Sequence, residues 1–135
     1  MWRAVLLYLW QLPQNLLGGV LILCTGAKKR GRLKGAGIYA VPAGGMRFGV
    51  SLGIYIILSE TDLDTRTIRH EYGHCLQSRL LGPFYLIVVG IPSAVFNNLW
   101  DRLFHRKWTN QARNRWYYSR FPEKQADRLG GVGKR

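Results

Sequence analysis

The sequence predicts an α+β fold that combines a small antiparallel sheet or hairpin, one central helix, a short C-terminal helix and an N-terminal membrane helix. Three observations predict it. An apolar segment covers residues 2–25 and carries one charge, Arg3. Two runs rich in β-branched and aromatic residues, 38–41 and 51–59, flank a Pro-Ala-Gly-Gly turn. Helix start and stop signals then bracket residues 63–81.

Composition limits the classes of protein to which the chain can belong. Its length of 135 residues favours one globular unit, and 47% apolar residues exclude a disordered polymer. Twenty Lys and Arg against seven Asp and Glu give a net charge of +13, which favours an anionic partner, either nucleic acid or an acidic membrane surface. Two cysteines exclude a disulfide framework.

Residues 1–27 are expected to form a membrane-anchoring helix, because the apolar part is long enough to cross about 30 Å of hydrocarbon. Gln11 and Pro13 interrupt it, so a kinked or interfacial helix is an alternative, as are a cleaved signal peptide and a buried helix of a soluble domain. The basic run 28–34 follows at once. By the positive-inside rule, this run predicts that the remainder of the chain faces the cytoplasm.

Residues 28–135 are expected to form the globular domain of the chain. Pro42, Gly44 and Gly45 disfavour a helix over 36–58 and favour a hairpin, with a second membrane helix as the alternative. In the helix 63–81, Thr61 or Asp62 is the expected cap, and Gly82 marks the end. The apolar segment 84–100 is divided by Gly90 and Pro92, which predicts an interfacial or re-entrant helix pair packed on the core.

The segment His70-Glu71-Tyr72-Gly73-His74 carries the clearest chemistry. Residues i and i+4 of a helix lie on one face, so both imidazoles can reach one ion, and their N-donor chemistry suggests Zn²⁺. Glu71 is offset by one residue. It would lie beside the ion, where it can take a proton from water as a general base.

A catalytic zinc ion needs a third protein ligand, for which the candidates are Glu123, Asp127 and His105. Glu123 and Asp127 share one face of a short helix bounded by Pro122 and Gly130. One carboxylate can bind the metal, and the other can accept the free N–H of a ligand histidine.

The motifs HEYGH and EKQAD together resemble the gluzincin metallopeptidases, and most closely the membrane-bound group that contains the CAAX prenyl endopeptidase and the bacterial heat-shock membrane protease. The resemblance implies a minimal zincin-like core, with Glu71 as general base and Asp127 as the partner of a ligand histidine. It implies that the zinc ligands are His70, His74 and Glu123. The chain is shorter than those enzymes, and no clear transition-state stabiliser is found; the candidates are Tyr117, Tyr118 and His105.

The resemblance implies a zinc-dependent metalloendopeptidase that hydrolyses a peptide or protein substrate, which strand 51–58 would align by strand addition. The basic tail, residues 102–135, predicts binding to anionic membrane lipid. One alternative is a nucleic-acid-binding protein, which the long apolar blocks disfavour. An intramembrane protease is disfavoured by the arginines flanking HEYGH, and a non-catalytic, metal-dependent scaffold is a further alternative.

Overall fold

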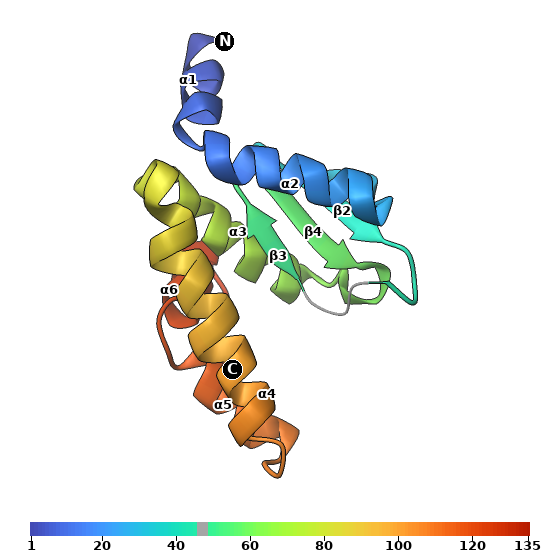
Figure 1. Ribbon diagram of the computed structural model, residues 1–135, viewed down its shortest axis with the longest axis vertical. Coiled ribbons are helices and arrows are strands. Elements are labelled where there is room, and N and C mark those ends of the chain that lie inside the picture. The colour runs from blue at the N-terminus through green and yellow to red at the C-terminus, as the bar shows by residue number, and fades with distance from the viewer. Residues whose placement is uncertain (46–48) are drawn as a thin grey trace.

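The computed structural model describes residues 1–45 and 49–135, which form an α+β fold, as the sequence predicts. A small sheet lies between helices, with helix α2 crossing one of its faces (Figure 1). The helices are α1 (Trp2–Trp10), α2 (Leu12–Thr25), α3 (Thr65–Leu81), α4 (Trp100–Phe104), α5 (Asn110–Tyr118) and α6 (Glu123–Gly130). The strands are β1 (Lys28–Leu33), β2 (Ala36–Val41), β3 (Val50–Leu52) and β4 (Tyr55–Ser59).

The sheet has the order β1-β2-β4-β3, and it is mixed rather than antiparallel. β1 pairs with β2 and β3 pairs with β4 in antiparallel fashion, whereas β2 and β4 run parallel. The expected hairpin between the runs 38–41 and 51–59 is therefore wrong. Gly53, at φ +65°, allows a tight turn inside the second run, which divides it into β3 and β4.

The basic run after α2 forms strand β1. The turn from β1 to β2 contains Lys34 and Gly35, both at positive φ, a combination that suits the twist of a two-residue hairpin. The side chains of Lys28, Lys29 and Arg32 are exposed on this outer strand.

The N-terminal apolar segment is divided into α1 and α2, whose axes differ by 84°. The break lies at Gln11, and Pro13 stands in the first turn of α2, where its missing N–H costs no hydrogen bond. The expectation of one membrane helix over 1–27 is not supported: among the described residues, no individual helix has both the length and the apolar character to cross a bilayer, although the bent pair together meets that test.

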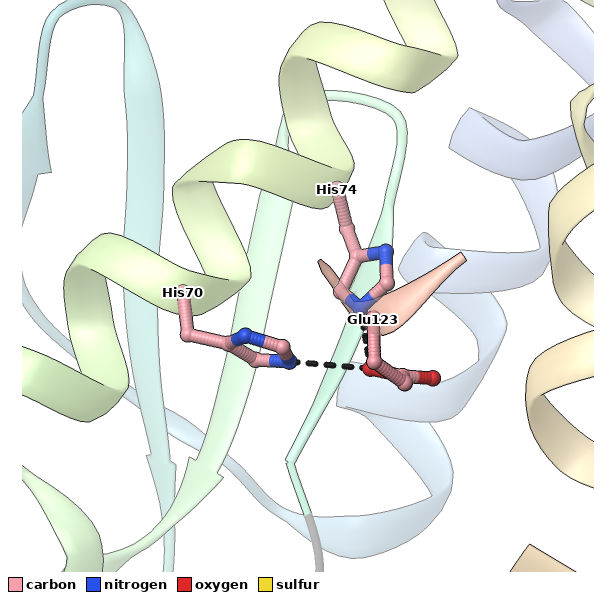
Figure 2. Close-up of side chains that lie close together, drawn as sticks. All are labelled: His70, His74 and Glu123. Carbon is pink, nitrogen blue, oxygen red and sulfur yellow. Dashed lines mark hydrogen bonds and ion pairs between the residues drawn. The ribbon is translucent and has the colours of Figure 1, made fainter. Parts of the chain in front are cut away.

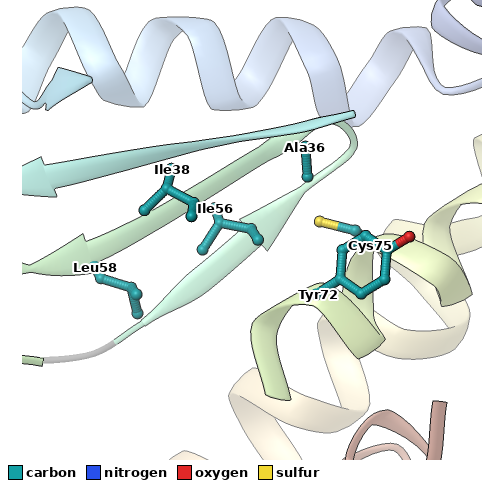
Figure 3. Close-up of a cluster of buried hydrophobic side chains, with 6 residues drawn as sticks. All are labelled: Ala36, Ile38, Ile56, Leu58, Tyr72 and Cys75. Atoms are coloured by element: carbon teal, nitrogen blue, oxygen red, sulfur yellow. The ribbon is translucent and has the colours of Figure 1, made fainter. Parts of the chain in front are cut away.

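Helix α3 lies against the sheet and carries the HEYGH segment. It begins two residues later than the expected range 63–81, because Asp64 Oδ1 accepts the N–H of Thr67 at 2.9 Å and caps the helix in place of Thr61 or Asp62. It ends at Gly82, as predicted. Tyr72 and Cys75 pack on the sheet residues of the core (Figure 3), which are Ala36, Ile38, Ile56 and Leu58.

The segment 85–104 is one continuous helical run, not the expected pair divided by Gly90 and Pro92. Residues 86–90 and 92–99 have π-helical geometry, and Pro92 stands at the first position of the second stretch, where proline is tolerated. Tyr85, Val89 and Asn97 are buried on its inner side.

Helix α6 packs directly on α3 through glycine. A Cβ atom on Gly73 would lie 1.9 Å from the carbonyl oxygen of Ala126, and one on Gly130 would lie 1.8 Å from the carbonyl oxygen of Arg69. The two backbones are therefore in contact, which brings Glu123 and Asp127 to the histidines of α3.

Candidate metal centre

The side chains of His70, His74 and Glu123 meet at one point between α3 and α6 (Figure 2). The histidines lie one helical turn apart on α3, and Nε2 of each is 3.0 Å from Oε2 of Glu123. All three side chains are buried, and their ligand atoms lie within 4.8 Å of one another. Among the residues that the structure describes, this is the His, Cys and carboxylate cluster with the geometry to hold a metal ion.

Hydrogen bonds on the far side of each ring leave the two Nε2 atoms free to bind a metal. His70 Nδ1 is 2.6 Å from Asp127 Oδ1, and His74 Nδ1 is 2.7 Å from Gln77 Oε1. The amide of Gln77 is oriented by its own donor group, which donates to the carbonyl of Pro122 and to Gln125 Oε1. Its oxygen therefore accepts from His74. In their neutral form, both rings therefore carry the proton on Nδ1, which leaves the lone pair of Nε2 available to a metal ion.

The electrostatics of the cluster favour positive charge at the point where these groups meet. Burial lowers the pKa of His70, but hydrogen bonds to Asp127 and Glu123 outweigh this effect and raise it to about 9. Burial raises the pKa of Glu123, but its hydrogen bonds to both histidines hold that pKa well below its ordinary value. An ionised Glu123 attracts a cation to this point, and either protons or a divalent metal ion can supply the charge.

The dimensions of the cluster suit zinc. A tetrahedral ion with ligand distances of about 2.0–2.1 Å sets its ligand atoms about 3.3 Å apart. The observed Nε2–Oε2 separations of 3.0 Å are within a few tenths of an ångström of that spacing. Two imidazoles and one carboxylate also form the kind of ligand set that leaves a fourth position for water or substrate.

Glu71 lies beside this cluster and is held by Ser51 of strand β3. Ser51 Oγ is 2.7 Å from both Oε2 and the carbonyl oxygen of Glu71. Gly49 leaves room for the carboxylate, because a Cβ at that position would lie 2.5 Å from Glu71 Oε1. A cavity of about 130 Å³ is lined jointly by Glu71 and the three candidate metal ligands. A carboxylate fixed in this position can act on a water molecule in the cavity.

A wider cleft adjoins the cavity, and the two share Gly49, His70, Glu71, Asn98 and Tyr117. The cleft has a volume of about 820 Å³ and a largely polar lining. Strand β3 lines the smaller cavity and is the last strand in the sheet order. The segment 51–58, which was expected to form one strand, is divided, so that β3 lies at the edge of the sheet and β4 lies inside it.

The three candidates for transition-state stabilisation lie in different surroundings. Tyr117 lines both the cavity and the cleft, and its hydroxyl accepts a hydrogen bond from Asn98 Nδ2 at 3.2 Å. The ring of Tyr118 lies edge-on to His70, with centroids 5.2 Å apart. His105 does not join the site: its Nδ1 is 3.1 Å from Asp101, and its ring stacks on Trp108.

Three residues around the site were not predicted from the sequence. Ser93, on the helical segment 85–104, donates a hydrogen bond to Oε1 of Glu123. Arg135 pairs with both oxygens of Asp127, at 2.7 and 2.9 Å. Gln77 stands three residues after His74 on the same helix face, so helical spacing could have identified it. No local signal identifies Ser93 or Arg135, because both reach the site through the tertiary fold.

Comparisons with protein-family models, with curated proteins and with solved structures each find no match to this chain.

Proposed function

We propose that this protein is a membrane-associated zinc metalloendopeptidase with a minimal zincin-like core, of the gluzincin type. One observation carries the proposal. Nε2 of His70 and of His74 converge on one oxygen of Glu123, and the Glu71 carboxylate lines the same cavity. The basic residues that follow the apolar helices favour a cytoplasmic location for the catalytic part.

Zinc bound by His70, His74 and Glu123 would supply Lewis-acid activation of water and of the scissile carbonyl. Residues of the protein would transfer the proton and orient the ligands. Glu71 accepts the proton of the attacking water and later delivers it to the leaving amine. Asp127 and Gln77 hold the two imidazoles in the tautomer that metal binding requires.

Tyr117 is the best placed of the three candidates to stabilise a developing oxyanion. Its position in the lining of both the cavity and the cleft puts its hydroxyl near a substrate bound there. Burial raises the pKa of Tyr117, so the hydroxyl keeps its proton and can donate it in a hydrogen bond.

A peptide that extends from the cleft into the smaller cavity can pair with the edge of β3, which lines that cavity. Such pairing gives binding through the main chain and tolerates varied side chains. The expected substrate is therefore an extended segment of a peptide or protein.

The proposal is tested by metal analysis and by peptide hydrolysis with one set of variants. We expect about one zinc ion per chain. His74→Ala and Glu123→Ala should lose it, whereas Glu71→Gln should retain zinc and lose cleavage of an unstructured reporter peptide. Hydrolysis that persists in Glu71→Gln would refute the catalytic assignment. Zinc binding without hydrolysis in the unmodified protein would favour the metal-dependent scaffold instead.

A further inference from the structure

Helix α2 is arranged with its polar side chains inside and its apolar side chains outside. Gln14 and Asn15 are 0% and 1% exposed, whereas the neighbouring Leu16 and Leu17 are 58% and 48% exposed. A helix that packs on a soluble core in water shows the reverse pattern, because burial of leucine is favourable and burial of amides is costly. The arrangement therefore indicates that the outer face of α2 does not meet water.

The buried polar groups hold α2 in this orientation. Gln14 Nε2 donates to Ser78 Oγ at 2.9 Å and to the carbonyl of Gly82 at 2.8 Å. Ser78 in turn donates to Gln11 Oε1 at 2.8 Å. Asn15 Oδ1 accepts the N–H of Ile54 at 2.9 Å. A rotation of α2 that buried its leucines would break these bonds, so the outward apolar face is part of the fold.

The helical segment 85–104 also exposes a large apolar face. Tyr85, Val89 and Asn97 face inward, and Asn97 Nδ2 donates to the carbonyl of Phe121. Large apolar side chains are exposed on its outer side. They include Ile87, Val88, Ile91, Val95, Phe96, Leu99, Trp100, Leu103 and Phe104.

These two apolar faces adjoin one another. The indole of Trp10, at the turn between α1 and α2, donates to the carbonyl of Arg79 at 3.0 Å and packs on Gly82. Phe84 is exposed just beyond this contact. Figure 1 shows the start of the segment 85–104 beside the corner between α1 and α2. We call the exposed apolar side chains of α1, α2 and residues 84–104 the docking surface.

The charge pattern identifies the occupant of the docking surface. No acidic residue occurs in 1–59 or in 72–100, the stretches that contain most of this surface. Exposed basic residues accompany it in the sequence: Lys28, Lys29 and Arg32 follow α2, and Arg102, Arg106 and Lys107 lie at and just beyond the end of the segment 84–104. A second copy of the chain would bring like charges together, whereas an anionic bilayer offers hydrocarbon and negative headgroups together.

We propose that the docking surface inserts into the boundary between headgroups and hydrocarbon of an anionic lipid bilayer. The angle of 84° between α1 and α2 suits helices that follow the membrane surface. This inference deepens the proposed function without depending on metal. The inner side of the segment 85–104 lines the catalytic cavity through Tyr85 and Val89, and Ser93 contacts Glu123. The wall of the cavity is thus the helix whose outer side meets lipid.

Thiol labelling tests the proposal directly. Cys24 is exposed on α2 and Cys75 is buried, so an environment-sensitive fluorophore attaches at position 24. A second reporter is Ile91→Cys in a Cys24→Ser background, and the control in that background is Ser119→Cys. On addition of vesicles of phosphatidylcholine and phosphatidylglycerol, emission at 24 and 91 should shift to shorter wavelength and be quenched by spin-labelled lipid. Emission at 119 should not change.

Vesicle flotation of charge variants completes the test. Leu16→Glu and Ile91→Glu alter exposed side chains, and each should weaken partitioning about tenfold or more. Gln111→Glu and Asn114→Glu add the same charge at exposed positions outside the docking surface and should have little effect. His74→Ala should float like the unmodified protein, which separates this proposal from the metal site. The proposal would be overturned if both sets of charge variants weakened partitioning equally. It would also be overturned if the emission at positions 24 and 91 did not shift, or if it shifted without lipid as the protein dimerised.

Discussion

Replacement of Gly73 by alanine tests whether direct contact between the backbones of α3 and α6 sets the metal centre. The new Cβ would lie 1.9 Å from the Ala126 carbonyl oxygen, and real Cβ atoms essentially never approach closer than 3.0 Å. The backbone of α6 must therefore retreat by at least 1.1 Å. Glu123 moves with α6, so its carboxylate is drawn away from the two imidazoles.

The magnitude follows from two opposing effects. Overpacking in a close-packed interior costs about 1–3 kcal/mol, and a backbone atom cannot yield as a flexible side chain can, so the upper half of that range applies. Alanine gains about 1 kcal/mol over glycine in helix propensity. We expect a net loss of about 1–2 kcal/mol, or a fall in Tm of about 4–8 °C. Zinc affinity should fall about 100-fold or more, since a ligand is displaced.

Thermal unfolding and competition with a chromophoric zinc chelator measure the two effects. Gly19→Ala is the matched control, because Gly19 lies within α2 and a Cβ there would have no atom within 4 Å. It should gain the helix propensity without the clash and leave zinc affinity unchanged. If Gly73→Ala were as stable as the unmodified protein and bound zinc equally well, the proposed packing of α6 on α3 would be refuted.

Three further predictions concern single contacts. Asp127→Ala removes the acceptor for His70 Nδ1 and should lower zinc affinity about 10- to 100-fold in a calorimetric titration, so an unchanged affinity contradicts the orienting role. Ser51→Ala frees the Glu71 carboxylate and should lower kcat about tenfold while zinc content stays constant, and loss of zinc instead would make Ser51 a purely structural residue. Burial raises the pKa of Asp101, but hydrogen bonds from Arg113 and His105 outweigh it and hold the pKa below its ordinary value. The contribution of Asp101 to stability is therefore complete above about pH 4 and is lost as the pH falls through the folded-state pKa. Tm should be lower in Asp101→Asn than in the unmodified protein at about pH 6, and the difference should vanish on acidification; a constant difference would exclude the ion pair as its cause.

Helical periodicity explains which parts of the candidate site could be predicted from the sequence. The spacing of His70 and His74 places both rings on one face because α3 is a regular helix, and Glu123 and Asp127 share a face of α6 for the same reason. Gly73 stands between the two histidines, and its missing side chain lets the backbone of Ala126 approach α3. The roles of these residues in binding and catalysis stay predictions.

The pairing of the strands could not be predicted from the sequence in the same way. The parallel contact between β2 and β4 joins segments that are separated by a further strand, so no local signal encodes it. The basic run 28–34 was interpreted as a flank of a membrane helix because its charges mask a strand whose residues are exposed or only partly buried. Asp64 caps α3 in place of the expected Thr61 or Asp62, because its side chain accepts the N–H of Thr67. Threonine and aspartate are both good capping residues, so residue type alone did not identify the cap. Non-local partners and competing caps therefore account for the errors.

The edge of strand β3 carries a consequence for substrate binding under the proposed function. The hydroxyl of Tyr85 donates to the Ser51 carbonyl at 2.8 Å, so this main-chain acceptor already has an internal partner. A peptide that adds to β3 has to compete with that hydroxyl, and exchanging one hydrogen bond for another changes the free energy by only about 0.5–1.5 kcal/mol. Short peptides should therefore bind weakly, and selectivity should depend on chain length more than on the identity of any one side chain.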